Sequence, residues 1–380
     1  MENTNKRLRI GEGKISGIVS IFLGLLSLIG LLCFRFPEWL TTPDLREVYT
    51  GEMVEKLIFG AIIVSFIFSL ISFVLSKEKR YALIGLSLCI LTIMLGGFGV
   101  EGRSVEKVSW SLGLDWLIID LLLMAILFVP IEMVLPKRND QPRFHEEWRT
   151  DLVYFIISHL FIQLFGVITK KPATALFGGM NLEGIQTWVQ SLPFVVELFL
   201  ALLITDLFQY WTHRFFHSHH YLWRFHSIHH STKAMDWLAG SRTHFVDIFV
   251  TRTMSFIPLY VMGFSTITFN TYIIFIAIHA VLIHANTRIN FGFLKYIIST
   301  PQFHHWHHCL EPEFYGKNFA VVFPFIDKIF GTYYLPKNVW PSGTGLHEAT
   351  FPKGYVSQLV YPFKKNPFKN DLSPEERTDR

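Results

Sequence analysis

Charge is scarce in this chain of 380 residues: Asp, Glu, Lys and Arg make up only 17%, whereas a soluble domain carries about 25%. The three cysteines lie far apart, which leaves no basis for a disulfide framework or a thiolate zinc site. Basic residues lie at the ends of apolar segments and in no nucleic-acid-binding motif, so the net charge of +4 predicts no nucleic-acid partner. These absences, together with 51% hydrophobic residues, favour an integral membrane protein.

Eight apolar stretches are roughly long enough to cross a bilayer, which takes about 20 residues of helix. They are residues 15–34, 57–76, 81–100, 115–135, 151–169, 192–211, 248–264 and 267–285. The first is too long for the apolar region of a signal peptide, so we expect it to be retained as a span. The last pair is consistent with two spans or with one re-entrant hairpin. The predicted fold class is all-α, a polytopic helical bundle in the membrane.

The distribution of Lys and Arg predicts which ends of these spans face the cytoplasm. Basic residues concentrate at residues 6–14, in the loop 76–80 (SKEKR) and in the loop 137–149. Because Lys and Arg favour cytoplasmic loops, we place the N-terminus inside. Six spans then bring the chain to His213 on that side, and two more, or a hairpin, return it there for His304. Both histidine-rich segments are therefore predicted on the cytoplasmic face.

The stretches and the histidines divide the chain into three predicted regions. Residues 1–140 form an N-terminal region of four spans without candidate ligands. Residues 141–340 hold the remaining spans and nearly all the histidines, and form the predicted catalytic domain. Residues 341–380 are rich in Pro and Gly and then charged, which predicts a cytoplasmic tail with disordered final residues.

Histidine is concentrated: 14 of the 17 histidines lie within residues 213–308. The segment contains HRFFH (213–217), HSIHH (226–230), HAVLIHAN (279–286) and HHWHH (304–308). Side chains three and four residues apart share a helix face, so we expect the histidines of each box to reach a metal together. The predicted metal ligands are His213, His217, His226, His229, His230, His279, His284, His304, His307 and His308.

This many imidazoles can hold two metal ions without carboxylates while leaving positions open for oxygen. Imidazole binds iron, zinc, copper and nickel, and electron-poor ions suit oxidation of a C–H bond. A single HxxxH more often binds nothing, but ordered boxes within 96 residues predict a metal site. His145, His159 and His347 are interpreted as ordinary polar residues. His219, His220 and His305 adjoin the boxes but fall outside their spacing, so either reading is open for them.

Three runs of sequence resemble the fatty acid hydroxylase and sterol desaturase superfamily. They are DLFQYWTHRFFHSHHYLWRFHSIHHSTKAMDWLAGSRTH, TPQFHHWHH and NFAVVFPFIDKIFGTYYLP, within residues 206–336. The resemblance implies a cytoplasmic, histidine-rich dimetal cap with two non-haem iron ions, for which zinc can substitute. It also implies O2 as co-substrate, electrons from a separate reductase or cytochrome, and a hydroxylated or desaturated lipid product. The order of the boxes looks more like the alkylglycerol monooxygenase and bacterial sterol-desaturase-like branches.

The resemblance also bears on four residues outside the boxes. Asp236, Arg242 and His244 match family positions, and Asp206 is a carboxylate inside a span, where buried charge tends to be functional. We take these four as candidate catalytic residues, the two carboxylates acting as partners of the ligand histidines. Helix capping or ordinary ion pairs are the alternative roles. For His279 the alternative is a hydrogen-bonded histidine inside the bundle.

Two other functions fit parts of the pattern. A metal-handling membrane protein would carry histidines in a cytoplasmic loop, but such loops have irregular repeats rather than ordered boxes. A catalytically inactive lipid-binding member of the family would keep the membrane region and lack turnover. A membrane metalloprotease is excluded because neither His145-Glu146 nor His347-Glu348 continues as HExxH.

Overall fold

The computed structural model describes residues 11–46, 51–97, 99, 111–160, 162–346 and 351–364. The basic residues 6–9, His347 and the charged end of the predicted tail lie outside these ranges. The described residues are helical and form no β-strand; an isolated bridge joins Cys309 and Thr344. The predicted all-α class is confirmed.

The chain divides into two compact units, residues 1–119 and 120–380. The boundary between the units falls inside α6 (Leu114–Val134). The functional regions that we predicted from the sequence meet at residue 140 instead, and that division stays a prediction. Besides the start of α6, the described residues of unit 1 form three long helices and two short ones. They are α1 (Lys14–Arg35), α2 (Pro37–Leu40), α3 (Pro43–Arg46), α4 (Gly51–Leu75) and α5 (Arg80–Met94).

Small residues bring α1, α4 and α5 of unit 1 into close contact. Ser65 Oγ on α4 donates to the Ser20 carbonyl on α1 at 2.7 Å. A Cβ on Gly85 of α5 would lie 2.3 Å from Ser20 Oγ and 2.5 Å from Ser69 Oγ, so only glycine fits at this crossing. Large apolar side chains such as Phe22 and Phe59 point outward and are exposed. This is the packing expected of helices in lipid, where small residues rather than apolar burial bring helices together.

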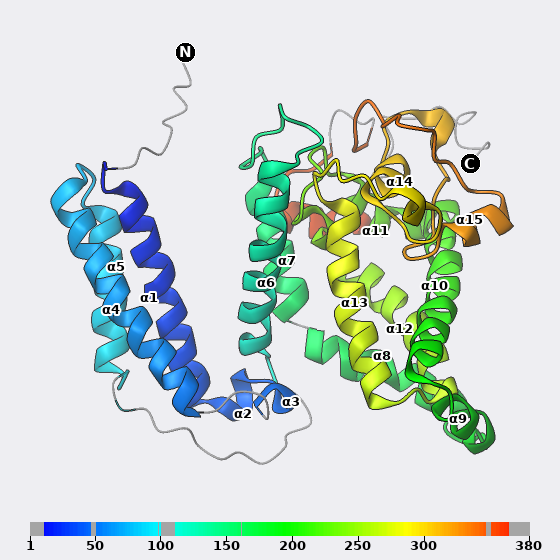
Figure 1. The fold of residues 1–380 in the computed structure, drawn as a ribbon, viewed down its shortest axis with the longest axis horizontal. Coiled ribbons are helices and arrows are strands. Elements are labelled where there is room, and N and C mark those ends of the chain that lie inside the picture. Colours follow the sequence, from blue (N-terminus) through cyan, green and yellow to red (C-terminus); the bar gives the residue numbers. More distant parts are fainter. Residues whose placement is uncertain are drawn as a thin grey trace. The chain divides into compact units, whose positions relative to one another are not determined.

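Unit 2 contains the end of α6 and all the histidine boxes. Its longer helices are α7 (Trp148–Leu160), α8 (Ile162–Phe177), α9 (Glu183–Gln190), α10 (Phe194–Ser218), α11 (His220–His230), α12 (Phe245–Met262) and α13 (Thr266–His284). Short helices follow in η1 (Ala239–Ser241), η2 (Gly292–Tyr296), α14 (Pro301–His307), η3 (Pro312–Phe314), α15 (Pro324–Phe330), α16 (Tyr355–Val360) and η4 (Tyr361–Phe363). In Figure 1, α11, α14 and α15 gather at one end of the upright helices α10 and α13.

Among the described residues, six helices are long and apolar enough to cross a membrane: α1, α4, α6, α10, α12 and α13. Each coincides with a predicted span, and the chain is a multi-pass membrane protein. In the other two of the eight predicted spans, the described residues form shorter helices. The stretch 81–100 holds α5, an apolar helix of only 15 residues.

The predicted span 151–169 covers most of α7 and the start of α8, which have 13 and 16 residues. Residue 161, between them, lies outside the described residues, so this span stays a prediction. Asp151 of α7 forms an ion pair with Arg242, and His159 faces Asp120, so α7 packs against polar partners inside unit 2.

The last two predicted spans are two helices, α12 and α13, joined by a tight turn, and each is long and apolar enough to cross a membrane. Gly263 ends α12 in the left-handed region (φ 61°), donating its N–H to the Leu259 carbonyl, which is the usual glycine C-cap. Ser265 then caps α13, and its backbone N–H donates to Glu197 of α10 at 2.6 Å. This turn sends the chain back, so the ends of α10 and α13 that carry histidines lie together.

Candidate metal centre

One face of α10 carries a stripe of polar side chains that organises the site. Asp206, Tyr210, His213 and His217 follow each other at spacings of four, three and four, so they point the same way. The buried Asp206 carboxylate accepts backbone N–H bonds from Val321, Val322 and Phe323 at 2.8, 3.1 and 2.6 Å. It thereby fixes the loop 319–323 against the helix, beside His213.

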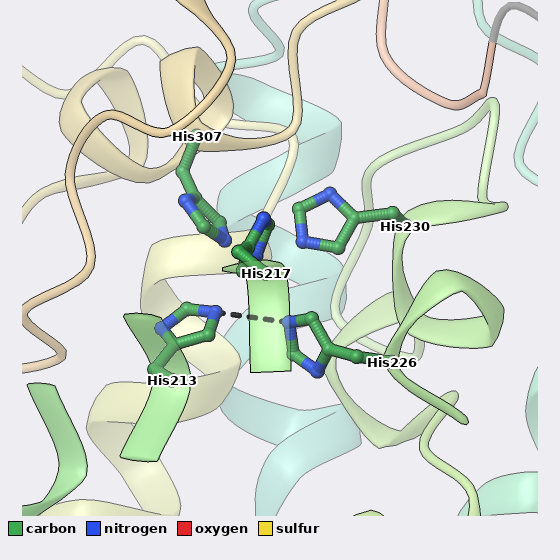
Figure 2. A group of neighbouring side chains, drawn as sticks. All are labelled: His213, His217, His226, His230 and His307. Carbon is green, nitrogen blue, oxygen red and sulfur yellow. Dashed lines mark hydrogen bonds between the residues drawn. The ribbon is translucent and has the colours of Figure 1, made fainter. Parts of the chain in front are cut away.

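The first group of histidines comes from three helices. It consists of His213, His217, His226, His230 and His307, with one ring nitrogen of each within 4.8 Å of the others. His213 Nε2 lies 2.9 Å from His226 Nε2. Figure 2 shows the five rings turned toward a common centre, His307 from α14 on one side and the other four from α10 and α11.

The second group is made of His229, His284, His304 and His308, again with one nitrogen of each within 4.8 Å of the rest. Here Nε2 of His284 lies 2.9 Å from that of His304 and 3.2 Å from that of His229. All four residues are buried. The two groups adjoin, because the rings of His230 and His308 stack with their centroids 4.3 Å apart. Within the described residues, neither group includes a carboxylate or a cysteine.

Each HxxHH box is shared between the two groups rather than directed at one metal. His226 and His230 of α11, four residues apart, join the first group, while His229 joins the second. His304 and His308 join the second group, and His307 joins the first. We expected each box to converge on one point. The structure keeps His213 and His217 together in the first group but divides both HxxHH boxes between the two groups, which is a geometry for two adjacent ions.

Hydrogen bonds at Nδ1 fix the tautomer of most of these imidazoles. A carbonyl oxygen only accepts, so an Nδ1 atom bonded to one must carry the proton, which leaves the Nε2 lone pair for a metal. Carbonyls hold Nδ1 of His213 (Phe319, 2.9 Å), His307 (Lys317, 2.8 Å), His229 (Arg242, 3.2 Å) and His284 (Ala280, 2.6 Å). His226 Nδ1 lies 2.6 Å from the Asp247 carboxylate.

The remaining nitrogens of the first group fit a bound metal. Nε2 of His217, His230 and His307 is buried and has no hydrogen-bond partner, although buried polar atoms are nearly always satisfied. Burial, reinforced by the neighbouring imidazoles, holds the pKa of His230 and His307 well below the ordinary value. The same causes act on His229, His304 and His308. Neutral imidazoles that point at one another with free lone pairs are able to bind a metal ion.

We expect replacement of Asp247 by Asn to weaken metal binding by about 10- to 100-fold, as loss of such a partner does elsewhere. The Asp247 carboxylate orients His226 and raises the basicity of its Nε2. The neutral amide of Asn raises this basicity less. Metal retained after dialysis against a chelator measures the effect. Thr251→Val is the matched control, because it removes only the hydroxyl that donates to Asp247 Oδ1. Equal retention in both variants would contradict the assignment.

Five of the predicted site residues lie outside both groups. His279 Nε2 contacts the Val321 carbonyl at 3.0 Å, as expected of a hydrogen-bonded histidine in the bundle. Asp206 holds backbone amides, as described above. His244 caps α12 and contacts the Leu359 carbonyl. Arg242 pairs with Glu147 and Asp151, and Asp236 lies near His145.

Two features of the site were missed from the sequence. Asp247 lies 21 residues after His226, and the only signal was its position in the first turn of the helix that follows RTH. His145, interpreted as an ordinary polar residue, is buried beside Asp151 and Asp236. Neither contact has a local spacing in the sequence, because each joins segments brought together only by the fold.

Comparison with known proteins agrees with this geometry. Residues 198–332 match the family model described as fatty acid hydroxylase. An ornithine lipid hydroxylase of Rhizobium tropici is 31% identical over 179 residues, which cover 47% of this chain and 54% of that protein. An alkylglycerol monooxygenase of Danio rerio is 29% identical over 43% of this chain and 36% of its own length. A methylsterol monooxygenase of Arabidopsis thaliana is 30% identical over 36% and 46%.

The alignments span about half or less of these relatives. No solved structure is significantly similar to the chain. The matched residues 198–332 nevertheless contain all nine grouped histidines, together with Asp247 and the carbonyls of the loop 317–321 that orient them. The segment that matches the fatty acid hydroxylase family model therefore contains the whole histidine site.

Proposed function

We propose that this protein is a membrane-bound oxygenase that hydroxylates or desaturates a C–H bond of a lipid. It would use two iron ions, O2, and electrons from a separate reductase or cytochrome, with the histidines on the cytoplasmic face. The observation that carries the proposal is the convergence of nine histidines into two adjoining groups. Zinc binds the same ligands and is expected to occupy the site without supporting turnover.

The residues of this chain have definite parts in that activity. The first group would hold one ion and the second group the other. When bound, iron supplies the activation of O2 and the one-electron chemistry that side chains cannot provide. The carbonyls of Phe319 and Lys317 keep two of the imidazoles oriented, and burial of the second group and of His226, His230 and His307 limits the access of bulk water to the reaction.

A lipid substrate fits the position of the groups. His213 and His217 lie at the end of α10, and His284 is the last residue of α13, both helices long and apolar enough to span the membrane. The hydrocarbon chain of a lipid that enters between such helices would reach the metal ions without leaving the bilayer. The relatives are named for an ornithine lipid, alkylglycerols and methylsterols, so these three classes form the first panel of candidate substrates.

Isotope labelling tests the proposal. Cells that express the full chain are supplied with the three lipid classes under 18O2, and their lipids are compared by mass spectrometry with cells expressing a His213→Ala, His304→Ala variant. Hydroxylation would place one labelled oxygen in a product that the variant does not form, and desaturation would remove two hydrogens without label. Metal-loaded wild-type protein that changes no lipid would overturn the proposal and favour the inactive or metal-handling alternatives.

A further inference from the structure

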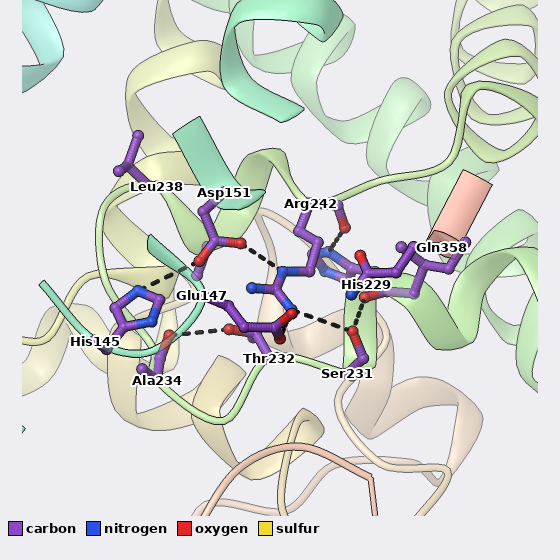
Figure 3. Close-up of polar contacts among 12 residues, drawn as sticks. His145, Glu147, Asp151, His229, Ser231, Thr232, Ala234, Leu238, Arg242 and Gln358 are labelled. Carbon is purple, nitrogen blue, oxygen red and sulfur yellow. Dashed lines mark hydrogen bonds and ion pairs between the residues drawn. The ribbon is translucent and has the colours of Figure 1, made fainter. Parts of the chain in front are cut away.

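A third cluster of metal-binding side chains lies outside the two histidine groups. It joins His145, just before α7, Asp151 of α7, and Asp236 in the loop between α11 and η1. One ligand atom of each lies within 4.8 Å of the others. All three residues are buried, with exposed fractions of 7%, 0% and 5%. Figure 3 shows the His145 ring facing Asp151, which lies between it and Arg242.

Each carboxylate of this cluster has one oxygen engaged and the other directed at His145. Asp151 Oδ1 accepts from Arg242 Nε at 2.5 Å. Asp236 Oδ1 accepts from the backbone N–H groups of Leu238 and Ala239 at 3.0 and 3.1 Å. The two Oδ2 atoms each lie 3.3 Å from His145 Nε2.

These separations suit a shared cation better than hydrogen bonds. A charge-assisted N–H···O bond is about 2.7–2.9 Å long. Both contacts at 3.3 Å exceed that length, and His145 Nε2 and the fully buried Asp151 Oδ2 have no hydrogen-bond partner. Two ligand atoms that each lie about 2.1 Å from a tetrahedral ion are about 3.4 Å apart. The observed distances of 3.3 Å are therefore close to the distance between two ligand atoms of one tetrahedral ion.

The local charge also favours a cation. The guanidinium of Arg242 pairs with the carboxylates of Glu147 and Asp151, and the Asp236 carboxylate adds a further acidic group beside His145. Burial lowers the pKa of His145, but the carboxylates of Asp236 and Asp151 outweigh it and raise that pKa above the ordinary value. Positive charge is thus stabilised here, whether it comes from a proton or from a metal ion.

We propose that His145, Asp151 and Asp236 bind one divalent cation, of the zinc, ferrous or manganous class, separate from the two ions of the histidine groups. A cavity of about 350 Å³, lined by His145, Glu147 and Arg242 among others, adjoins the cluster on the side of His145. The proposal stands whether or not the chain oxidises lipids.

The position of this cation indicates a structural role. It would connect the segment before α7, α7 itself and the loop 231–242. That loop ends at Arg242, whose carbonyl accepts the bond from His229 Nδ1 in the second histidine group. The cation would therefore stabilise the backbone that orients a ligand of the neighbouring site.

Metal counting on the full-length protein in detergent tests the proposal. Protein from cells grown with added zinc, iron and manganese is analysed for total metal per chain by mass spectrometry. We expect three ions in the wild type, two in His145→Ala and in Asp236→Asn, and one remaining in a His229→Ala, His307→Ala variant. His159→Asn is the matched control, since His159 of α7 faces a single carboxylate, Asp120, and its loss should leave three.

The wild-type count needs no variant, so a folding defect cannot hide the answer. Two ions in the wild type, both lost with His229 and His307, would overturn the third site while supporting the histidine centre. An unchanged count in folded His145→Ala would do the same. One ion in the wild type that depends on His145 and not on the boxes would support the third site and contradict the proposed dimetal centre.

Discussion

Replacing His307 with alanine is expected to lower the yield of oxidised lipid by at least about 100-fold. Loss of a residue that only hydrogen-bonds to a metal ligand already lowers metal affinity or activity by about 10- to 100-fold. The His307 Nε2 atom is buried, has no hydrogen-bond partner and lies with four other imidazoles. Alanine removes the one ligand that α14 contributes to the first group. We therefore expect the ions of the histidine groups to fall from two per chain to one.

The neighbouring His305 provides the matched control. It belongs to the same HHWHH box and is equally buried, but its Nε2 contacts the His284 carbonyl at 3.3 Å and it lies in neither group. His305→Gln keeps a donor for that carbonyl and should retain both ions of the histidine centre. If His305→Gln lost metal and His307→Ala kept it, the assignment of ligands within the box would be wrong.

The histidine boxes show which part of the site the sequence predicts. Local spacing predicts which histidines gather: nine of the ten predicted ligands lie in the two groups, and His279, whose alternative role was open, lies outside. The division of the two HxxHH boxes between the groups does not follow from spacing. It depends on how α14 is placed against α10 and α11, which the packing of distant segments decides.

The membrane region shows the same limit. Six predicted spans match helices because about 20 apolar residues impose a helix wherever they lie in a bilayer. The contacts of Asp151 and His159, inside the predicted span 151–169, escaped prediction because their partners, Arg242 and Asp120, lie far away in the sequence. A polar residue inside an apolar stretch is informative only once its partner is known.

Arg242 illustrates how a family position can be structural. We predicted a catalytic role, but its guanidinium is 1% exposed and turned toward Asp151 and Glu147, at 2.5 and 2.8 Å. Only its backbone carbonyl contacts the metal centre, through His229. In Figure 3 the Arg242 guanidinium points toward Asp151, and the Arg242 carbonyl points toward His229. A side chain so placed would act on the reaction by positioning.

Arg242→Met is therefore expected to destabilise the protein by about 3–5 kcal/mol, because it leaves the buried Asp151 carboxylate and its neighbour Glu147 without their cation. For a chain of this size the loss corresponds to a melting temperature lower by about 5 °C, measured by thermal unfolding in detergent. Arg242→Lys keeps the charge but loses the planar fork that reaches both carboxylates, so an intermediate decrease is expected.

Activity separates the two roles of Arg242. If the guanidinium positions the loop 231–242, the folded fraction of Arg242→Met at low temperature keeps its two ions in the histidine groups, and activity per folded chain falls much less than in His307→Ala. A catalytic guanidinium predicts the reverse: an unchanged melting temperature with a large loss of turnover. The buried ion pairs favour the first outcome, since removing one partner of such a pair exposes the other to an apolar interior.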